Sequence, residues 1–189
     1  MIFTPTPLPG AYVIEPRRIA DDRGFFARIL CVDEFQKKDL RLHLPQTNMS
    51  RTFRRGTLRG LHFQESPHAE IKIIRCTKGA VYDVIVDIRP KSPTFKRWFG
   101  AELTQDNFKA LYVPEGFAHG YLTLEDDTEV YYHTSEFYHP ESATGVRYND
   151  PEFGIVWPIE VAVVSRQDSE WPDFKMRRML TASDKEMAS

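Results

Sequence analysis

The stretch EIKIIRCTKGAVYDVIVDIR, residues 70–89, decides the fold class. It contains two runs rich in β-branched residues separated by Gly79, a pattern typical of strands joined by a turn. Asp83 and Asp87 interrupt the second run, which predicts a strand with one face partly open to water. Similar short runs bounded by Gly or Pro are FKRWFGAEL (95–103), KALYVP (109–114), YLTL (121–124) and EVYYHTSEFY (129–138). Their regular spacing predicts an all-β sandwich or barrel.

One stretch outside these runs favours a helix. VDEFQKKDL, residues 32–40, has helix-forming residues and offers Asp33 as the N-cap. The polar end of the chain, residues 173–189, predicts a frayed terminus or a short helix. Because there is no low-complexity linker and no internal repeat, we expect a single domain spanning residues 1–189.

Composition points to a soluble protein of the cytoplasm. The hydrophobic share is 41%, the charged share is 28% and the net charge is -2, which gives no attraction to nucleic acid or to an anionic membrane. Cys31 and Cys76 lie in apolar settings that suit buried thiols in a reducing compartment. We expect neither a signal peptide nor a membrane span, because the first residues lack a basic region and no apolar run is long enough.

The strand-like stretch LRGLHFQ, residues 58–64, carries a cation, a glycine and a histidine that a purely structural strand does not need. Strict alternation places His62 on the same face as Gly60, with Arg59 on the opposite face. Gly60 either leaves side-chain space beside His62 or marks a bulge that turns Arg59 inward. Three roles are open to His62 at this point: a satisfied core histidine, a metal ligand or a catalytic base.

Lys72 lies on the same predicted strand face as the apolar Ile74 and Cys76. A lysine on an apolar face costs free energy unless it is paired or functional. The structural alternative is a side chain that extends to solvent at the end of the strand.

The pattern Pro-x-Gly-x-x-His in VPEGFAHGY, residues 113–121, predicts a tight turn that delivers His119 into a barrel mouth. It resembles the second motif of the cupin superfamily of small double-stranded β-helix barrels. In metal-binding cupins a first motif adds two histidines and a glutamate. Here Lys72 lies where a carboxylate would be useful, and a cation repels a metal ion. The remaining metal-binding alternative is a three-histidine set of His62, His68 and His119.

Two further groups of residues suggest a bound ligand. Tyr131 and Tyr132 are adjacent and point to opposite faces, and Tyr132 is the inward candidate because it shares its face with Val130. The basic stretch SRTFRRGTLR, residues 50–59, suits a diphosphate, which one or two arginines hold in a bidentate manner. Phe25 and Phe26, close to Arg23, suit stacking on a base or packing in the core.

These stretches together resemble the family of dTDP-4-dehydrorhamnose 3,5-epimerases. The resemblance runs in collinear order through DDRGFF (21–26), QTNMS (46–50), GTLRGLHFQ (56–64), KIIRCTKGAVYDVIVDIRPKSPTF (72–95), VPEGFAHGYLTL (113–124), YYHTSEFY (131–138), YNDPEFGIVWP (148–158) and VSRQD (164–168). It implies a cupin-type jelly roll with a few short peripheral helices, a homodimer, and no metal or other cofactor. Residues 1–50 would supply N-terminal strands and the short helix, residues 51–160 the barrel core, and residues 161–189 a C-terminal segment.

The resemblance also implies roles for individual residues. Epimerisation beside a ketone removes a carbon-bound proton, stabilises an enolate and returns a proton to the opposite face. The family pattern places the base at His62, its partner carboxylate at Asp168, the enolate-stabilising cation at Lys72 and the opposing acid at Tyr132. The substrate contacts that the resemblance implies are Arg23, Phe26, Gln46, Asn48, Arg59, His119 and Tyr138.

The resemblance predicts an epimerase that inverts C3, C5 or both in a nucleotide-linked 4-keto-6-deoxyhexose. Four positions depart from the family pattern, and they leave the nucleotide, the sugar and the inverted carbon open: Arg28, Thr47, Met49 and Gln167. The alternatives are a 3-epimerase that acts on another nucleotide sugar, a metal-dependent cupin oxygenase or isomerase, and a cupin that binds sugar without catalysis.

Overall fold

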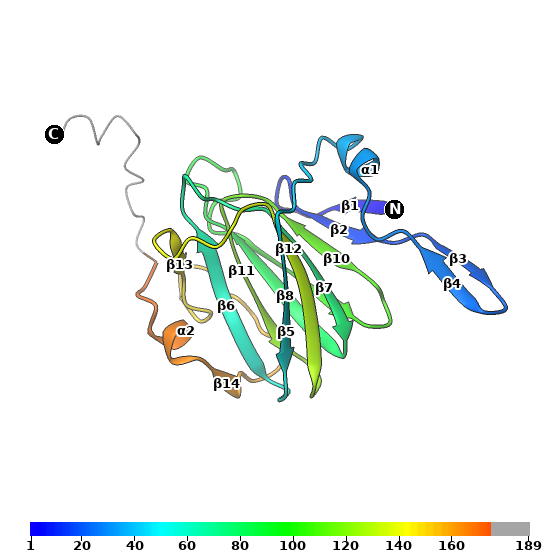
Figure 1. Cartoon of the computed structure of the whole chain (residues 1–189). Helices are drawn as coiled ribbons and strands as arrows, with labels where there is room; N and C mark the ends of the chain where they lie inside the picture. Colours follow the sequence, from blue (N-terminus) through cyan, green and yellow to red (C-terminus); the bar gives the residue numbers. More distant parts are fainter. Residues whose placement is uncertain (175–189) are drawn as a thin grey trace.

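The computed structural model describes residues 1–174, which form two facing six-stranded sheets and a separate two-stranded hairpin (Figure 1). The first sheet contains, in spatial order, β1 (Ile2–Pro5), β2 (Tyr12–Glu15), β10 (Ala110–Val113), β7 (Lys72–Lys78), β12 (Thr128–Thr134) and β5 (Gln46–Thr52). The second contains β13 (Ala143–Gly145), β6 (Thr57–Gln64), β11 (Phe117–Thr123), β8 (Ala80–Asp87) and β9 (Trp98–Thr104). A short strand, β14 (Val163–Val164), runs parallel to β6.

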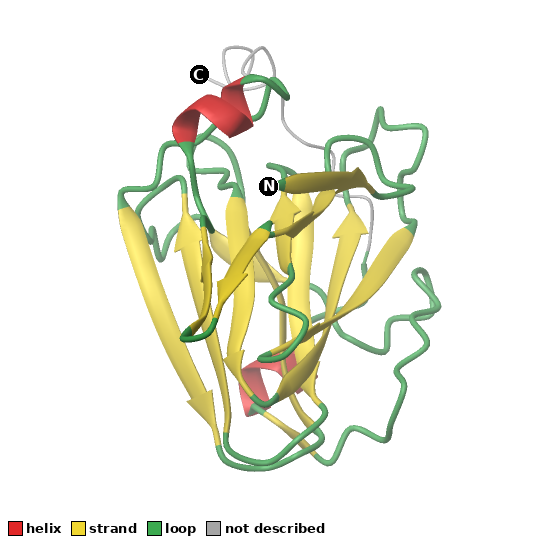
Figure 2. Ribbon diagram, turned by 90° about the vertical axis from the view of Figure 1, so that its right-hand side faces the viewer, coloured by secondary structure: helices red, strands yellow, loops and turns green. Residues whose placement is uncertain are grey.

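From β5 to β13 the chain crosses repeatedly between the two sheets, which is the connectivity of a jelly roll. The hairpin of β3 (Arg18–Asp21) and β4 (Gly24–Ala27) extends away from the sheets (Figure 1). Two five-residue helices, α1 (Val32–Gln36) and α2 (Arg166–Glu170), lie toward opposite ends of the strands (Figure 2). The predicted all-β jelly roll with a few short peripheral helices is confirmed.

Apolar side chains fill the space between the sheets and cover both outer faces. Strand β8 shows this arrangement: Val81 and Ile85 point into the inner core, while Val84 and Val86 pack under the segment that contains Phe153. Because both faces of β8 are covered, its sequence is a nearly continuous apolar run. On the outer face of the first sheet, a third cluster packs around the fully buried side chain of Phe35.

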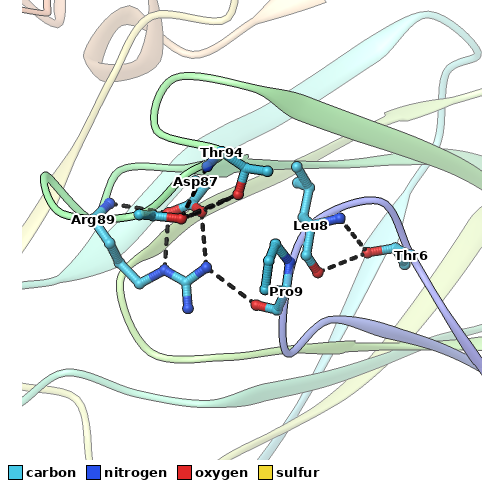
Figure 3. A network of polar contacts seen from close by, with 7 residues as sticks. Thr6, Leu8, Pro9, Asp87, Arg89 and Thr94 are labelled. Carbon is cyan, nitrogen blue, oxygen red and sulfur yellow. Dashed lines mark hydrogen bonds and ion pairs between the residues drawn. The ribbon is translucent and has the colours of Figure 1, made fainter.

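The prediction that Asp83 and Asp87 mark a half-solvated strand is wrong, because both side chains are fully buried. Asp87 accepts hydrogen bonds from Arg89, Ser92 and Thr94, and Arg89 also donates to the carbonyl of Pro9 (Figure 3). Burial alone would raise the pKa of Asp87, but these donors hold it below its ordinary value. A buried carboxylate thus ties the loop after β8 to the N-terminal turn.

The helix predicted for residues 32–40 is shorter than expected and begins differently. Cys31, whose backbone is extended, is the N-cap residue and makes no side-chain capping bond, whereas Asp33 lies in the first turn. The helix ends at Gln36, and the chain turns at Asp39, where φ is 55°. The C-terminal stretch 173–189, predicted to fray or to form a short helix, lies almost wholly outside the described residues. No helix among residues 1–174 is long and apolar enough to cross a bilayer.

Candidate active site

Two adjoining cavities, of about 270 and 520 Å³, open between the two sheets. Four side chains line both of them: His62, Lys72, Tyr132 and Gln167. Lys72 and Tyr132 come from strands of the first sheet, whereas His62 comes from the second. A ligand in this shared region would therefore have His62 on one side and Tyr132 on the other.

A bulge in β6 brings His62 and Arg59 to the same face, which confirms the alternative that Gly60 marks a bulge and overrides strict alternation. In the register of β6 and β11, His62 lies opposite His119 and Arg59 lies opposite Tyr121. Two residues of β6 are therefore left opposite the single Gly120. Gly60 has φ of 129°, and a Cβ there would lie 2.5 Å from the Cα atom of Gly120. Only glycine fits this position, and its bulge turns Arg59 into the larger cavity.

His62 forms a short hydrogen bond with a buried carboxylate. Its Nε2 lies 2.6 Å from Oδ1 of Asp168, whose Oδ2 accepts from the backbone N–H of Gly60 at 3.1 Å. Asp168 is held in α2, where its own backbone N–H donates to the N-cap Ser165. Burial would raise the pKa of Asp168, but the hydrogen bonds from His62 and Gly60 hold it below the ordinary value. The ionised carboxylate fixes the imidazole with its Nδ1 available to a ligand.

Lys72 is almost enclosed in the shared region and has two oxygen partners. Its Nζ lies 3.0 Å from Oε1 of Glu70 and donates to the carbonyl oxygen of His62 at 3.3 Å. The side chains of Lys72 and Glu70 are each 11% exposed, so this ion pair is well shielded from water. Sequence reasoning missed Glu70; its position two residues before Lys72, on the same strand face, was the available signal.

Tyr132 points inward as predicted, whereas Tyr131 lies on the outer face and is 40% exposed. Burial raises the pKa of the Tyr132 phenol, and the nearby Glu70 carboxylate raises it further, while Arg59 lowers it. At neutral pH the phenol is therefore protonated and is a hydrogen-bond donor and acid.

His119 forms a second histidine–carboxylate pair in the larger cavity. Its Nε2 lies 3.0 Å from both carboxylate oxygens of Asp83, and the Asp83 side chain is fully buried. Sequence reasoning missed this role for Asp83, although an aspartate on the same strand face as Val81 and Ile85 was a usable signal.

The other predicted substrate contacts divide into two groups. Gln46, Asn48 and Tyr138 line the smaller cavity, where Gln46 Nε2 donates to Asn48 Oδ1 and Gln46 Oε1 accepts from the backbone N–H of Tyr138. Arg23 and Phe26 line neither cavity, because they lie on the β3–β4 hairpin. The Arg23 side chain is 90% exposed and forms an ion pair with Asp21, two residues away.

The structure does not assemble the alternative three-histidine metal set. His68 lines neither cavity; its ring stacks on that of His139, with centroids 3.5 Å apart. His62 and His119 are each hydrogen-bonded to a different aspartate. The donor set thus differs from the cluster of ligands that a cupin metal centre requires.

Comparison with known proteins gives a consistent family assignment. The dTDP-4-dehydrorhamnose 3,5-epimerase family model matches residues 5–176. A dTDP-4-dehydrorhamnose 3,5-epimerase of Sinorhizobium fredii is 42% identical over 173 residues, covering 91% of this chain and 89% of the relative. A dTDP-4-dehydrorhamnose 3-epimerase of Streptomyces niveus is 37% identical over 171 residues, covering 90% of this chain and 82% of the relative.

A crystal structure of dTDP-4-dehydrorhamnose 3,5-epimerase from Bacillus anthracis, with TDP and PPi bound, superimposes with a TM-score of 0.88 at 41% identity. The match covers 92% of this chain and 99% of that one. The chain therefore belongs to the dTDP-4-dehydrorhamnose 3,5-epimerase family and is an enzyme of the isomerase class.

Proposed function

We propose that this enzyme inverts C3, C5 or both of a dTDP-linked 4-keto-6-deoxyhexose, feeding the synthesis of deoxysugars such as rhamnose for cell-surface glycans. One observation carries the proposal: His62, which is hydrogen-bonded to Asp168, and the Tyr132 phenol line the same two cavities from opposite sheets. A base on one wall and an acid on the other supply the two proton transfers that an epimerisation needs.

In the first proposed step, Nδ1 of His62 removes the proton from the carbon beside the ketone. The electron pair of the broken C–H bond moves to the carbonyl oxygen and forms an enolate. The imidazolium is stabilised by the Asp168 carboxylate at 2.6 Å. Lys72 supports the negative charge on the enolate oxygen, and its exclusion from water strengthens that interaction.

In the second step, Tyr132 donates its phenolic proton to the same carbon from the opposite face. The electron pair returns from the enolate oxygen to form the new C–H bond and restore the ketone. His62 has then gained one proton and Tyr132 has lost one, and exchange with water restores both groups. These two steps transfer only protons, so the proposed reaction calls for no cofactor.

The remaining cavity residues suit the nucleotide diphosphate. Arg59 faces the larger cavity with a guanidinium that binds phosphate oxygens in a bidentate manner. Gln46, Asn48 and Tyr138 offer amide and aromatic contacts in the smaller cavity, and His119 offers a further contact in the larger one. The TDP bound in the Bacillus anthracis relative supports a thymidine nucleotide.

The test is solvent exchange, followed by NMR in deuterated water with a panel of 4-keto sugars that carry different nucleotides. Tyr132→Phe should still exchange the proton beside the ketone, because His62 remains, but should return it to the same face without inversion. Wild type should incorporate deuterium with inversion, and the positions labelled identify C3, C5 or both. Inversion at the wild-type rate in Tyr132→Phe would exclude Tyr132 as the acid.

We also propose a homodimer in which the β3–β4 hairpin serves the partner's site. The hairpin exposes Ile19 and Phe26, and the edge strand β5 exposes Met49, so apolar surface is available for a second copy. Arg23 and Phe26 cannot contact a substrate in their own cavity from this position, but a partner's hairpin can supply them.

This arrangement can be tested with mixed dimers, in which one subunit carries Arg23→Ala and the other carries His62→Ala. Each substitution should inactivate the homodimer, because it removes a different part of the shared site. If Arg23 acts in the partner's cavity, a mixed dimer contains one complete site and regains activity. Failure to regain activity in a verified mixed dimer would show that Arg23 does not act across the interface.

The proposal also covers the domain organisation and the cellular location of the enzyme. The chain forms one domain, since N-terminal strands β1 and β2 continue the first barrel sheet. The enzyme acts in the cytoplasm, which suits its two free thiols, Cys31 and Cys76.

A further inference from the structure

A cluster of two histidines and two glutamates lies on the loops beside the smaller cavity, and the proposed reaction does not use it. The cluster joins loop 65–71, between β6 and β7, to loop 135–142, between β12 and β13. We propose that His68, Glu136 and His139 bind a divalent transition-metal ion of the Zn²⁺ type. Donor atoms of these three side chains lie within 4.8 Å of one another, the only such group of His, Cys, Asp or Glu among residues 1–174.

The two ring nitrogens of His139 have different neighbours, and this difference fits metal binding. Nδ1 lies 3.1 Å from Oε1 of Glu141, a hydrogen-bond distance, whereas Nε2 lies 3.9 Å from Oε1 of Glu136, beyond one. Histidine ligands usually donate the second ring N–H to a carboxylate, which orients the ring. Nε2 of His139 is therefore the metal-binding atom, Glu136 is a second ligand, and Glu141 orients the imidazole.

The charge of the cluster also favours a cation. Oε1 of Glu141 lies 3.1 Å from Nδ1 of His139 and 3.9 Å from Nε2 of His68, so its carboxylate faces both rings. Within the described part of the chain, the ion pairs of Glu136 and Glu141 are made with histidines alone, and neither carboxylate pairs with lysine or arginine. Imidazole nitrogen with carboxylate oxygen suits zinc and similar ions better than magnesium or calcium.

The backbone under the cluster is already fixed by buried Gln64. Its Nε2 donates to the carbonyl oxygens of His68 and Phe137, each at 3.0 Å, and its Oε1 accepts from the backbone N–H of His139 at 2.6 Å. Because both loops are held by one side chain, the ligands need little backbone movement. The stacked rings of His68 and His139 must turn about their Cβ–Cγ bonds to aim at one ion.

The proposed ion would fasten one wall of the smaller cavity. Tyr138 lies between Glu136 and His139 in the chain, and its side chain lines that cavity although it is 64% exposed. A metal bound to both neighbours would restrict Tyr138 and join its loop to the loop that leads into Lys72. The side chains of His68 and His139 are about 30% exposed, so an ion can reach them from solvent.

Zinc titration of the chelator-treated full chain tests the proposal by calorimetry and thermal unfolding. Wild type should bind one Zn²⁺ per chain, and its melting temperature should rise by roughly 5–10 °C at a zinc concentration of about 100 times Kd. His68→Ala and His139→Ala should each weaken binding by at least about tenfold, which would reduce the thermal shift at the same zinc concentration to about half or less. His43→Ala, at a histidine outside the cluster, is the matched control and should behave as wild type.

Two further variants keep the outcome decisive. His139→Gln retains side-chain volume and should lose binding, which covers the case in which His139→Ala fails to fold. His62→Ala should bind zinc as wild type does, which separates this cluster from the proposed catalytic base. The proposal is overturned if wild type shows no saturable binding, or if folded His68→Ala and His139→Gln bind zinc with unchanged affinity.

Discussion

The two histidine–aspartate pairs of this enzyme have the same chemistry but different surroundings. His62 is 46% exposed and shares Asp168 with the backbone N–H of Gly60, whereas His119 is 10% exposed and lies 3.0 Å from both oxygens of Asp83. The first imidazole can therefore meet a substrate and exchange protons with water, while the second is held almost within the core. Exposure, rather than the pairing itself, therefore favours His62 over His119 as the proposed base.

The largest expected effect is that of His62→Ala, which removes the histidine that lines both cavities. Turnover should fall by about 10²- to 10⁴-fold, the range for loss of a general base, and solvent deuterium incorporation should be lost. His119→Ala should lower kcat/KM by only about tenfold, equivalent to one hydrogen bond, and should retain exchange. Full exchange in His62→Ala would reverse the assignment of the two histidines.

The two aspartates should separate the effects on rate and on stability. Asp168→Asn should lower kcat by about 10²- to 10³-fold with a small change in KM, because the amide no longer stabilises the imidazolium. Asp83→Asn should lower the unfolding free energy by about 1–3 kcal/mol, because the hydrogen bonding between His119 and a fully buried side chain is weakened. Steady-state kinetics and urea unfolding on both variants provide the measurement. Equal rate losses would show that the two pairs act alike.

A smaller effect concerns stability at acid pH. Hydrogen bonds hold the pKa of folded Asp168 below its ordinary value of 3.8, so its ionised form stabilises the fold fully above about pH 4. This contribution is lost as the pH falls from 3.8 through the lower folded-state pKa. The difference in unfolding free energy between wild type and Asp168→Asn should therefore be constant near neutral pH and shrink below about pH 4. A constant difference throughout the acid range would contradict the hydrogen-bonded, ionised carboxylate.

Much of the fold and part of the site follow from strand patterns. Runs of β-branched residues with turn signals predict the strands, and period-two alternation correctly places Lys72 and Tyr132 facing inward. Alternation fails for Arg59, because the bulge at Gly60 depends on how closely β6 approaches Gly120 of β11. That approach is a property of the paired strands and is absent from either sequence run alone.

Local sequence patterns could not predict which carboxylates form hydrogen bonds with His62 and His119. Asp168 lies 106 residues from His62 in the chain, and only the family resemblance pointed to it. Its position depends on β14 pairing with β6, which carries α2 to the cavity. The strand pattern predicted that Asp83 faces solvent. Such a pattern shows on which face a polar side chain lies, but it does not show whether a hydrogen-bond partner lies buried on that face.

By itself the sequence determined the strands, the inward faces of most of them and the residue types available for proton transfer, because these depend on the local pleat and on side-chain chemistry. Only the tertiary structure decided which aspartate serves which histidine, how the bulge turns Arg59 toward His62, and that the hairpin carries Arg23 away from its own cavity. It also brought His68 beside His139. Each of these arrangements is set by register and packing between distant segments, where small shifts of one strand change every contact.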